Sequence, residues 1–477
     1  MAEKAAPDRV RRAPLPPDPC AGGIADYAKR LRSGAITAEA ATQAYLKRIE
    51  ILEPAIQAFE HVAPDLALAQ ARAIDKLLAA GTDLGPLMGV PATIKDILAV
   101  NGMPTTGGSN LNVEDLIGPE GSFVKSLRLQ GVIFLGKVKT PEFAHGAGRF
   151  AMNLMRGTPT NPWDSKVLRV PGGSSSGSGA SVCAGFCAFS VGSDTGASVR
   201  FPAAFQGLHG LKTTCGLWPT DGVFSLSSSF DSLGIIAPSA RDEAYVFAAI
   251  SGKPVNALPL RGLRLGKLGP VDHFFGGMDP DVERSVNGAI AALTKAGVSI
   301  EPVEFTEATD SWGYPEFIYA EYIASYGRER FAKERDRMDP FVSTSLADGL
   351  NVKADDYVRI GRRFVELNRL AHQKLQGFDA WITPTTVVLP PACTDFDDEA
   401  KASKLRPVGS RNTRFGSFMG LCASSSPIQM FGNSKLPVGL QIICGGYQEA
   451  HCLGIGLALE TLTGLPPRPD LSGFFHD

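Results

Sequence analysis

Apolar residues recur every three or four positions in several stretches of the chain, a spacing that places them on one face of a helix. The clearest helix is predicted over 38–52, where Thr37 stands at the N-terminal cap position and the inward face carries Ala41, Tyr45, Ile49 and Leu52. Further helices are predicted over 65–80, 124–130 and 279–296, and a longer helical segment rich in aromatic residues over 311–375.

Short apolar runs bounded by glycine, proline or polar residues lie between these helices and predict strands. They occupy residues 89–97, 132–137, 186–191, 262–268, 299–305, 380–385 and 436–443, and a short helix and turn is predicted over 202–211. Helices and strands alternate with no internal repeat and no clear linker. The chain is therefore predicted to form one large α/β domain, with a mixed central β-sheet flanked by helices on both faces.

Composition narrows the class of function. The 477 residues carry a formal net charge of −2 and no basic stripe or arginine-rich arm, which argues against nucleic acid as a partner. No apolar run approaches the length that spans a membrane, so no membrane partner is expected and the protein is expected to be soluble. The 8 cysteines form no Cys-x-x-Cys pair and the 7 histidines are scattered, so neither a metal site nor a cofactor is predicted.

Residues 1–20 mix charged residues, alanine and proline, and they lack the apolar core of a signal peptide. They are expected to form a disordered tail or an extended arm, which leaves 21–477 as the folded domain. Without a targeting segment, the protein is expected in the cytoplasm.

Two glycine-rich turns between residues 170 and 200 each present a serine. They are Pro171-Gly172-Gly173-Ser174-Ser175-Ser176-Gly177-Ser178-Gly179 and Gly192-Ser193-Asp194-Thr195-Gly196-Ala197-Ser198-Val199-Arg200. A helix of about nine residues advances roughly 13 Å and a strand of about seven residues returns roughly 20 Å, so the connection between the turns can bring Ser174 and Ser198 to one site.

Lys95 is the second candidate for chemistry. It stands at the end of an apolar strand, among Val90, Ala92, Ile94 and Ile97. A lysine held there loses hydration, so that its neutral amine becomes accessible and can act as a general base to a serine. Most lysines are solvated surface charges, and that is the alternative for this one.

Gly173-Ser174-Ser175-Ser176-Gly177 also matches the G-x-S-x-G turn of α/β-hydrolases, which would make Ser175 the nucleophile of an esterase. That turn needs a strand running directly into it. Pro171 and two glycines interrupt any strand here, so this interpretation is the weaker alternative. A third interpretation, a flexible Gly/Ser loop, fits poorly because apolar elements flank the segment.

Four segments together resemble the amidase signature family. They are Gly89-Val90-Pro91 leading to Lys95-Asp96, then 171–175, then 192–204, and Gly207-Leu208-His209-Gly210-Leu211-Lys212. Weaker echoes lie at Ser229-Phe230-Asp231, at Thr383-Pro384-Thr385 and over 436–441, so the resemblance covers roughly residues 22–460.

The resemblance implies the amidase signature fold and a Ser–cis-Ser–Lys triad. Ser198 would be the nucleophile, Ser174 the bridging serine behind a cis Gly173–Ser174 peptide, and Lys95 the base. The backbone N–H groups of Thr195, Gly196, Ala197 and Ser198 would form the oxyanion hole. Ser175, Asp194 and Arg200 would support these groups from behind.

Two positions depart from the family pattern, which commonly has glycine where this chain has Ala197 and Ser176. Alanine still offers its N–H but tolerates a positive φ poorly, so the oxyanion turn would be strained if residue 197 needed one. Neither change removes a member of the triad.

The resemblance implies a hydrolase of carboxylic amides that passes through a Ser198 acyl-enzyme. The aromatic residues after position 311 favour bulky or aromatic amides, with carbamates (urethanes) and esters as further substrates, and 306–375 is expected to form a variable helical lid over them. The main alternative is a glutaminase of the amidotransferase A type that works with partner proteins. If the enzyme works without partner proteins, a homodimer is the assembly that we consider for it.

Overall fold

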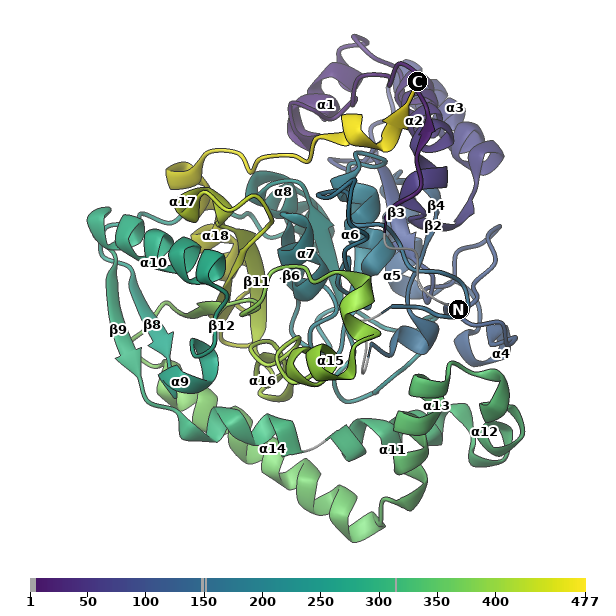
Figure 1. Cartoon of the computed structure of the whole chain (residues 1–477). Coiled ribbons are helices and arrows are strands. Elements are labelled where there is room, and N and C mark those ends of the chain that lie inside the picture. The colour runs from purple at the N-terminus through teal and green to yellow at the C-terminus, as the bar shows by residue number, and fades with distance from the viewer. Residues whose placement is uncertain (1–5, 147–149, 151, 314) are drawn as a thin grey trace.

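The computed structural model describes residues 6–146, 150, 152–313 and 315–477. Within them, eleven strands form one mixed sheet that crosses the molecule (Figure 1). In sheet order the strands are β2 (Phe59–Val62), β4 (Ile133–Val138), β3 (Pro91–Lys95), β5 (Phe189–Asp194), β7 (Ser232–Ala237), β6 (His209–Lys212), β11 (Cys422–Pro427), β12 (Gly439–Cys444), β10 (Ala380–Pro384), β8 (Arg264–Leu268) and β9 (Ser299–Val303). The predicted α/β domain with a mixed sheet is confirmed.

Parallel pairing places the ends of three strands together. β3 lies between β4 and β5 and pairs in parallel with both, so that Ile94 lies beside Val191. All residues of β3 and β5 are buried. Ligands of open α/β sheets bind outside the carboxyl ends of the strands, and Lys95 and Asp194 are the last residues of these two.

The helices lie around the sheet, and the longer ones pack against it or against one another. They are α1 (Ile24–Arg32), α2 (Ala38–Ile56), α3 (Pro64–Ala79), α4 (Glu114–Ile117), α5 (Ser122–Leu129), α6 (Ser176–Cys183), α7 (Arg200–Gln206), α8 (Ala240–Ser251), α9 (Val271–Phe274), α10 (Pro280–Lys295), α11 (Pro315–Tyr326), α12 (Arg328–Glu334), α13 (Pro340–Ala347), α14 (Ala354–Leu375), α15 (Glu399–Leu405), α16 (Arg414–Phe418), α17 (Gln429–Gly432) and α18 (Glu449–Thr463).

Helices cover both faces of the sheet, as β6 shows. Gly210 faces α7, because a Cβ at this glycine would lie 2.5 Å from the Cβ of Ala203. The neighbouring His209 faces the other way, where its Nε2 lies 3.6 Å from Oε2 of Glu460 in α18. α6 packs with α7 on the first face, and α8 packs with α18 on the second.

The elements expected from the sequence exist, with shifted ends. Thr37 caps α2 as expected, its hydroxyl oxygen accepting from the Ala40 N–H at 3.0 Å, but the helix continues through Pro54 to Ile56. The predicted helix and turn over 202–211 are instead α7 and the strand β6. β11 was not predicted, because its centre is three serines and it carries no apolar run.

Of the two forms expected for the N-terminal arm, a disordered tail or an extended arm, the described residues 6–20 take the extended form. β1 (Val10–Arg11) pairs in parallel with β13 (Phe475–His476) near the C-terminus. The Tyr45 hydroxyl donates to Asp18 at 2.6 Å, and the Arg48 guanidinium donates to the Pro16 carbonyl at 2.7 Å. These contacts fix an extended arm against α2.

The segment 306–375 is helical, as predicted, and lies along one side of the sheet domain (bottom of Figure 1). Besides α11–α14 it contains the 3₁₀ turns η2 (Thr306–Gly313), η3 (Arg335–Arg337) and η4 (Asp348–Asn351). The Glu321 carboxylate of α11 accepts from the Ser229 N–H at 3.1 Å, and Glu142 accepts from the Asp339 N–H at 2.6 Å. Both contacts attach the helical segment to loops of the sheet domain.

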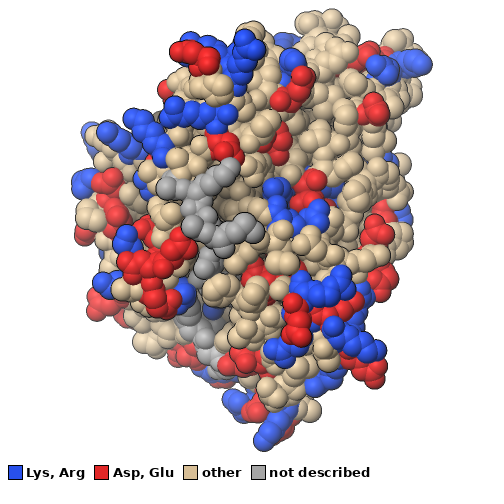
Figure 2. All heavy atoms as spheres, turned by 45° about the vertical axis from the view of Figure 1, so that its right-hand side comes forward, with Lys and Arg blue, Asp and Glu red and all other residues tan. Residues whose placement is uncertain are grey.

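Charged side chains of both signs are interspersed on the face drawn in Figure 2, in keeping with the net charge of −2. Among the described residues, no helix has the length and apolar character needed to cross a membrane.

Candidate active site

Lys95 lies at the carboxyl end of β3 and is fully buried. Its Nζ donates to Ser174 Oγ at 2.7 Å and to Ser193 Oγ at 2.8 Å. Burial away from water disfavours the charged amine and lowers the pKa of Lys95 from 10.5 to about 7, although the negative charges of Asp231 and Asp194 oppose that change. A substantial fraction of the amine is therefore neutral near pH 7.

Ser174 belongs to the turn that precedes α6, and it is almost fully buried beside Lys95. The Gly173–Ser174 peptide is cis, as the resemblance implied. Gly172 has φ +76°, and a Cβ there would lie 2.9 Å from Cα of Pro202. Only glycine fits this approach of the turn to α7, which explains part of the glycine-rich sequence.

Ser198 stands in the turn between β5 and α7 and lines a pocket. The Ser175 N–H donates to the Ser198 carbonyl oxygen at 3.1 Å, so the two glycine-rich turns lie side by side as their lengths predicted. Ser198 is partly exposed, whereas Lys95 and Ser174 are buried. A ligand in the pocket reaches Ser198 first.

A buried ion pair holds the turn that carries Ser198. Nη2 of Arg200 lies 2.9 Å from Oδ1 of Asp194, and the second carboxylate oxygen accepts from the Val199 N–H at 3.0 Å. Nη1 of Arg200 also donates to the Thr413 carbonyl at 2.8 Å. Burial alone would raise the pKa of Asp194, but the Arg200 charge and these hydrogen bonds hold it below its usual value.

Breaking this pair will destabilise the fold. Replacing Arg200 with methionine leaves the Asp194 carboxylate buried without its cation, so we expect the free energy of unfolding to fall by about 3–5 kcal/mol in urea denaturation. Lys401→Met removes an exposed pair with Asp395 and is the matched control, with no shift expected in the urea midpoint. An Arg200→Met midpoint equal to that of the wild type would contradict the assigned role.

The four residues expected at the oxyanion hole, 195–198, form a turn along the pocket wall. The Thr195 hydroxyl donates to Asp231 Oδ1 at 2.6 Å, and Oδ2 of the same carboxylate accepts from the Leu226 and Ser227 N–H groups at 2.9 and 3.0 Å. Ala197 is not among the described residues with positive φ. Its methyl group therefore introduces no left-handed strain.

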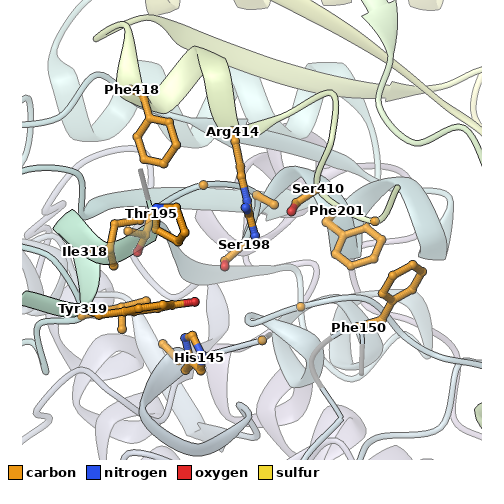
Figure 3. A pocket seen from close by; sticks show the side chains of 18 of the residues that line it. His145, Phe150, Thr195, Ser198, Phe201, Ile318, Tyr319, Ser410, Arg414 and Phe418 are labelled. Carbon is orange, nitrogen blue, oxygen red and sulfur yellow. The ribbon is translucent and has the colours of Figure 1, made fainter. Parts of the chain in front are cut away.

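The pocket encloses roughly 890 Å³ of atom-free space, part of it open to solvent. Figure 3 shows Ser198 at its centre, with Phe150 and Phe201 on one side and Ile318 and Phe418 on the other. Arg414 points into the same space from α16. Ile318 and Tyr319 come from α11, so the helical segment contributes directly to the pocket wall.

Three residues of this site carried no role in the sequence analysis. Ser193 accepts a hydrogen bond from Lys95. The parallel pairing of β3 with β5 places residues 192–193 beside Lys95, and knowledge of that pairing would have identified Ser193. Asp231 anchors Thr195 and was visible only as a weak echo of the family pattern. Arg414 lies far from the other residues along the chain, and nothing in its surrounding sequence pointed to the pocket.

Comparisons with known proteins show the family of the chain. The family model described as Amidase matches residues 40–453. A 2-amino-5-chloromuconic acid deaminase of Comamonas testosteroni is 34% identical, covering 94% of this chain and 98% of that protein. The A subunit of the glutamyl-tRNA(Gln) amidotransferase of Heliobacterium modesticaldum is 30% identical, covering 89% and 93%. The crystal structure of the native peptide amidase of Stenotrophomonas maltophilia, 25% identical, superposes with a TM-score of 0.79 over 96% of this chain and 100% of that one. The chain belongs to the amidase family.

Proposed function

We propose that this protein hydrolyses the C–N bond of carboxylic amides through an acyl-enzyme on Ser198. The observation that carries the proposal is the 2.7 Å hydrogen bond between Lys95 Nζ and Ser174 Oγ, in a turn that contacts the turn of the partly exposed Ser198 through the Ser175 N–H. A buried amine with a pKa of about 7 is suited to act as a base near neutral pH.

The proposed first half-reaction forms the acyl-enzyme. The neutral Lys95 amine takes the proton of Ser174 while Ser174 takes that of Ser198, and Ser198 Oγ attacks the amide carbon. The N–H groups of Thr195, Gly196, Ala197 and Ser198 stabilise the negative oxygen of the tetrahedral intermediate. The same relay returns the proton to the nitrogen, and the C–N bond breaks to release the amine.

In the second half-reaction, water gives a proton to the relay and attacks the acyl carbon. The C–O bond to Ser198 breaks, the relay returns the proton to Ser198 Oγ, and the carboxylic acid leaves. Asp194 and Arg200 keep the 195–198 turn in place during both steps, and Ser175 fixes the first turn through its Oγ, which donates to the Ser193 carbonyl at 3.2 Å.

Apolar and aromatic side chains around Ser198 favour substrates with a bulky or aromatic body. Carbamates and esters present a carbonyl to the same nucleophile and are proposed as further substrates. The segment 306–375 acts as the lid, because α11 supplies Ile318 and Tyr319 to the wall. The relative named as a deaminase also points to cleavage of a C–N bond.

The second candidate is a glutaminase that works within a larger assembly, favoured by relatives named as the A subunit of glutamyl-tRNA(Gln) amidotransferase. Turnover of a panel of anilides, short amides, carbamates, esters and glutamine by the purified chain separates the two. The proposal expects anilides and amides to react without any partner protein. Hydrolysis of glutamine alone, and only after partner proteins are added, would establish the second candidate instead.

An esterase that uses Ser175 as its nucleophile finds little support in the geometry. Ser175 is fully buried, its Oγ accepts from the Ser193 N–H at 3.3 Å, and it does not line the pocket. Residues 171–175, just before α6, form no strand that could run into such a turn.

A further inference from the structure

The charged side chains that line the pocket around Ser198, among the described residues, belong to arginines. Among the described residues that line it, two are arginines, Arg406 and Arg414, and none is aspartate or glutamate. Arg406 donates to both carboxylate oxygens of Glu399, at 2.5 and 2.8 Å, so its charge is balanced outside the pocket. Arg414 is the arginine whose side chain extends to the centre of the cavity, toward Ser198 (Figure 3).

The position of Arg414 is fixed at its backbone. The residue before it, Thr413, accepts from Nη1 of Arg200 at 2.8 Å, and Asn412 accepts from the Gln441 amide at 2.7 Å. The Asn412 side chain donates to the carbonyls of Phe274 and Pro384 at 2.7 and 2.8 Å. These buried contacts join the start of α16 to the turn that carries Ser198.

Contact with the Ser198 turn also places the Arg414 side chain. A Cβ added to Gly196 would lie 3.4 Å from Cγ of Arg414, so the arginine stem packs against this glycine. His145 lines the same pocket and is largely buried, and its Nε2 has no hydrogen-bond partner among the described residues. Burial, with a smaller contribution from the Arg414 charge, lowers the pKa of His145 to about 4, so this ring is neutral near pH 7.

We propose that Arg414 selects amides whose acyl part carries a carboxylate, by pairing its guanidinium with that carboxylate beside Ser198. This inference rests on the proposed amide hydrolysis, and it specifies in addition that the preferred substrate carries a negative charge. A planar guanidinium offers two parallel N–H donors to a carboxylate, and such a charge-assisted pair adds geometric specificity as well as binding energy. The aromatic walls then receive the rest of the substrate.

The test compares substrates that differ only at the end of the acyl chain. They are the mono-p-nitroanilide of succinic acid, its methyl ester, and the p-nitroanilide of butyric acid, all of which release p-nitroaniline. We expect kcat/KM for the acid to exceed that for the ester and for the butyryl compound by at least tenfold. A charge-assisted hydrogen bond supports a ratio of about this size.

The variant Arg414→Gln is expected to remove this preference, bringing the ratio of acid to methyl ester close to one. Arg411→Gln is the matched control, because Arg411 lies on the same loop and donates to the Gly276 carbonyl at 2.7 Å without lining the pocket. It is expected to keep the wild-type ratio. Succinate is expected to inhibit the wild type more strongly than butyrate does, and to lose that advantage in Arg414→Gln.

Two results would overturn the inference while leaving amide hydrolysis intact. One is a wild-type enzyme that prefers the ester or the butyryl anilide. The other is an equal loss for all three substrates in Arg414→Gln, which would assign the arginine to the folding of the loop or to the reacting carbonyl. Failure of the proposed function has a different signature: no anilide is turned over and no fluorophosphonate adduct forms on Ser198.

Discussion

Replacing Ser198 with alanine is expected to lower kcat/KM for amide and anilide hydrolysis by at least about 10⁴-fold. The reason is that, in the proposed mechanism, Ser198 supplies the oxygen that forms the acyl-enzyme, and its side chain lines the pocket (Figure 3). The measurement is steady-state turnover of a p-nitroanilide, together with the mass of the protein after treatment with a fluorophosphonate.

Ser175→Ala is the matched control for that experiment, because it removes a hydroxyl from the neighbouring turn. Its Oγ contacts only Ser193 among the hydrogen bonds of the described residues, so we expect a loss of no more than about tenfold and an unchanged adduct on Ser198. An adduct that persists in Ser198→Ala, or one that disappears in Ser175→Ala, would shift the nucleophile to Ser175.

The second large effect is expected at Lys95. The variant Lys95→Met removes the proposed base while preserving the length and the apolar stem of the side chain, and we expect kcat/KM to fall by about 10²–10⁴-fold. A variant that loses activity but keeps its structure would show that Lys95 acts in the reaction and does not serve to hold the fold. Circular dichroism and a thermal melt report on structure, and turnover reports on the base.

The stability of Lys95→Met follows from the sign of the pKa shift. Because the pKa of Lys95 is lowered to about 7 in the folded protein, the unfolded chain binds more protons between pH 7 and about 10.5, and the buried lysine disfavours folding most at low pH. Methionine removes this penalty, while Ser174 and Ser193 lose a donor. We therefore expect the melting temperature of the variant at pH 7 to be no lower than that of the wild type. A marked drop would mean that the lysine serves to hold the fold.

Much of the site could be predicted from residues that lie close together in the sequence. Apolar neighbours and a strand end pointed to a buried Lys95, and the helix and strand between the two glycine-rich turns pointed to the contact of one turn with the other. Both patterns are local, because burial of a strand and the length of a connection are set by a few consecutive residues. The mixed sheet followed in the same way from the alternation of elements.

What could not be predicted depends on contacts between distant segments. The role of Ser193 needed the register of β3 against β5, and the role of Arg414 needed the packing of α16 against the Ser198 turn. The strand β11 was not predicted, because three serines form the centre of this fully buried strand and give it no apolar pattern. The arm over 6–20 looked disordered by composition, yet partners far along the chain hold it.

The pH dependence of Ser198 labelling tests the central claim most directly. A fluorophosphonate reacts with the activated serine without any choice of substrate, and peptide mapping locates the adduct. For the wild type between pH 5 and 9, the account predicts an adduct on Ser198 and a rate that rises with pH through about 7 as Lys95 loses its proton. In Lys95→Met the rate is predicted to be low and nearly independent of pH. An adduct on another residue, or an unchanged rise through pH 7 without the lysine, would contradict the account.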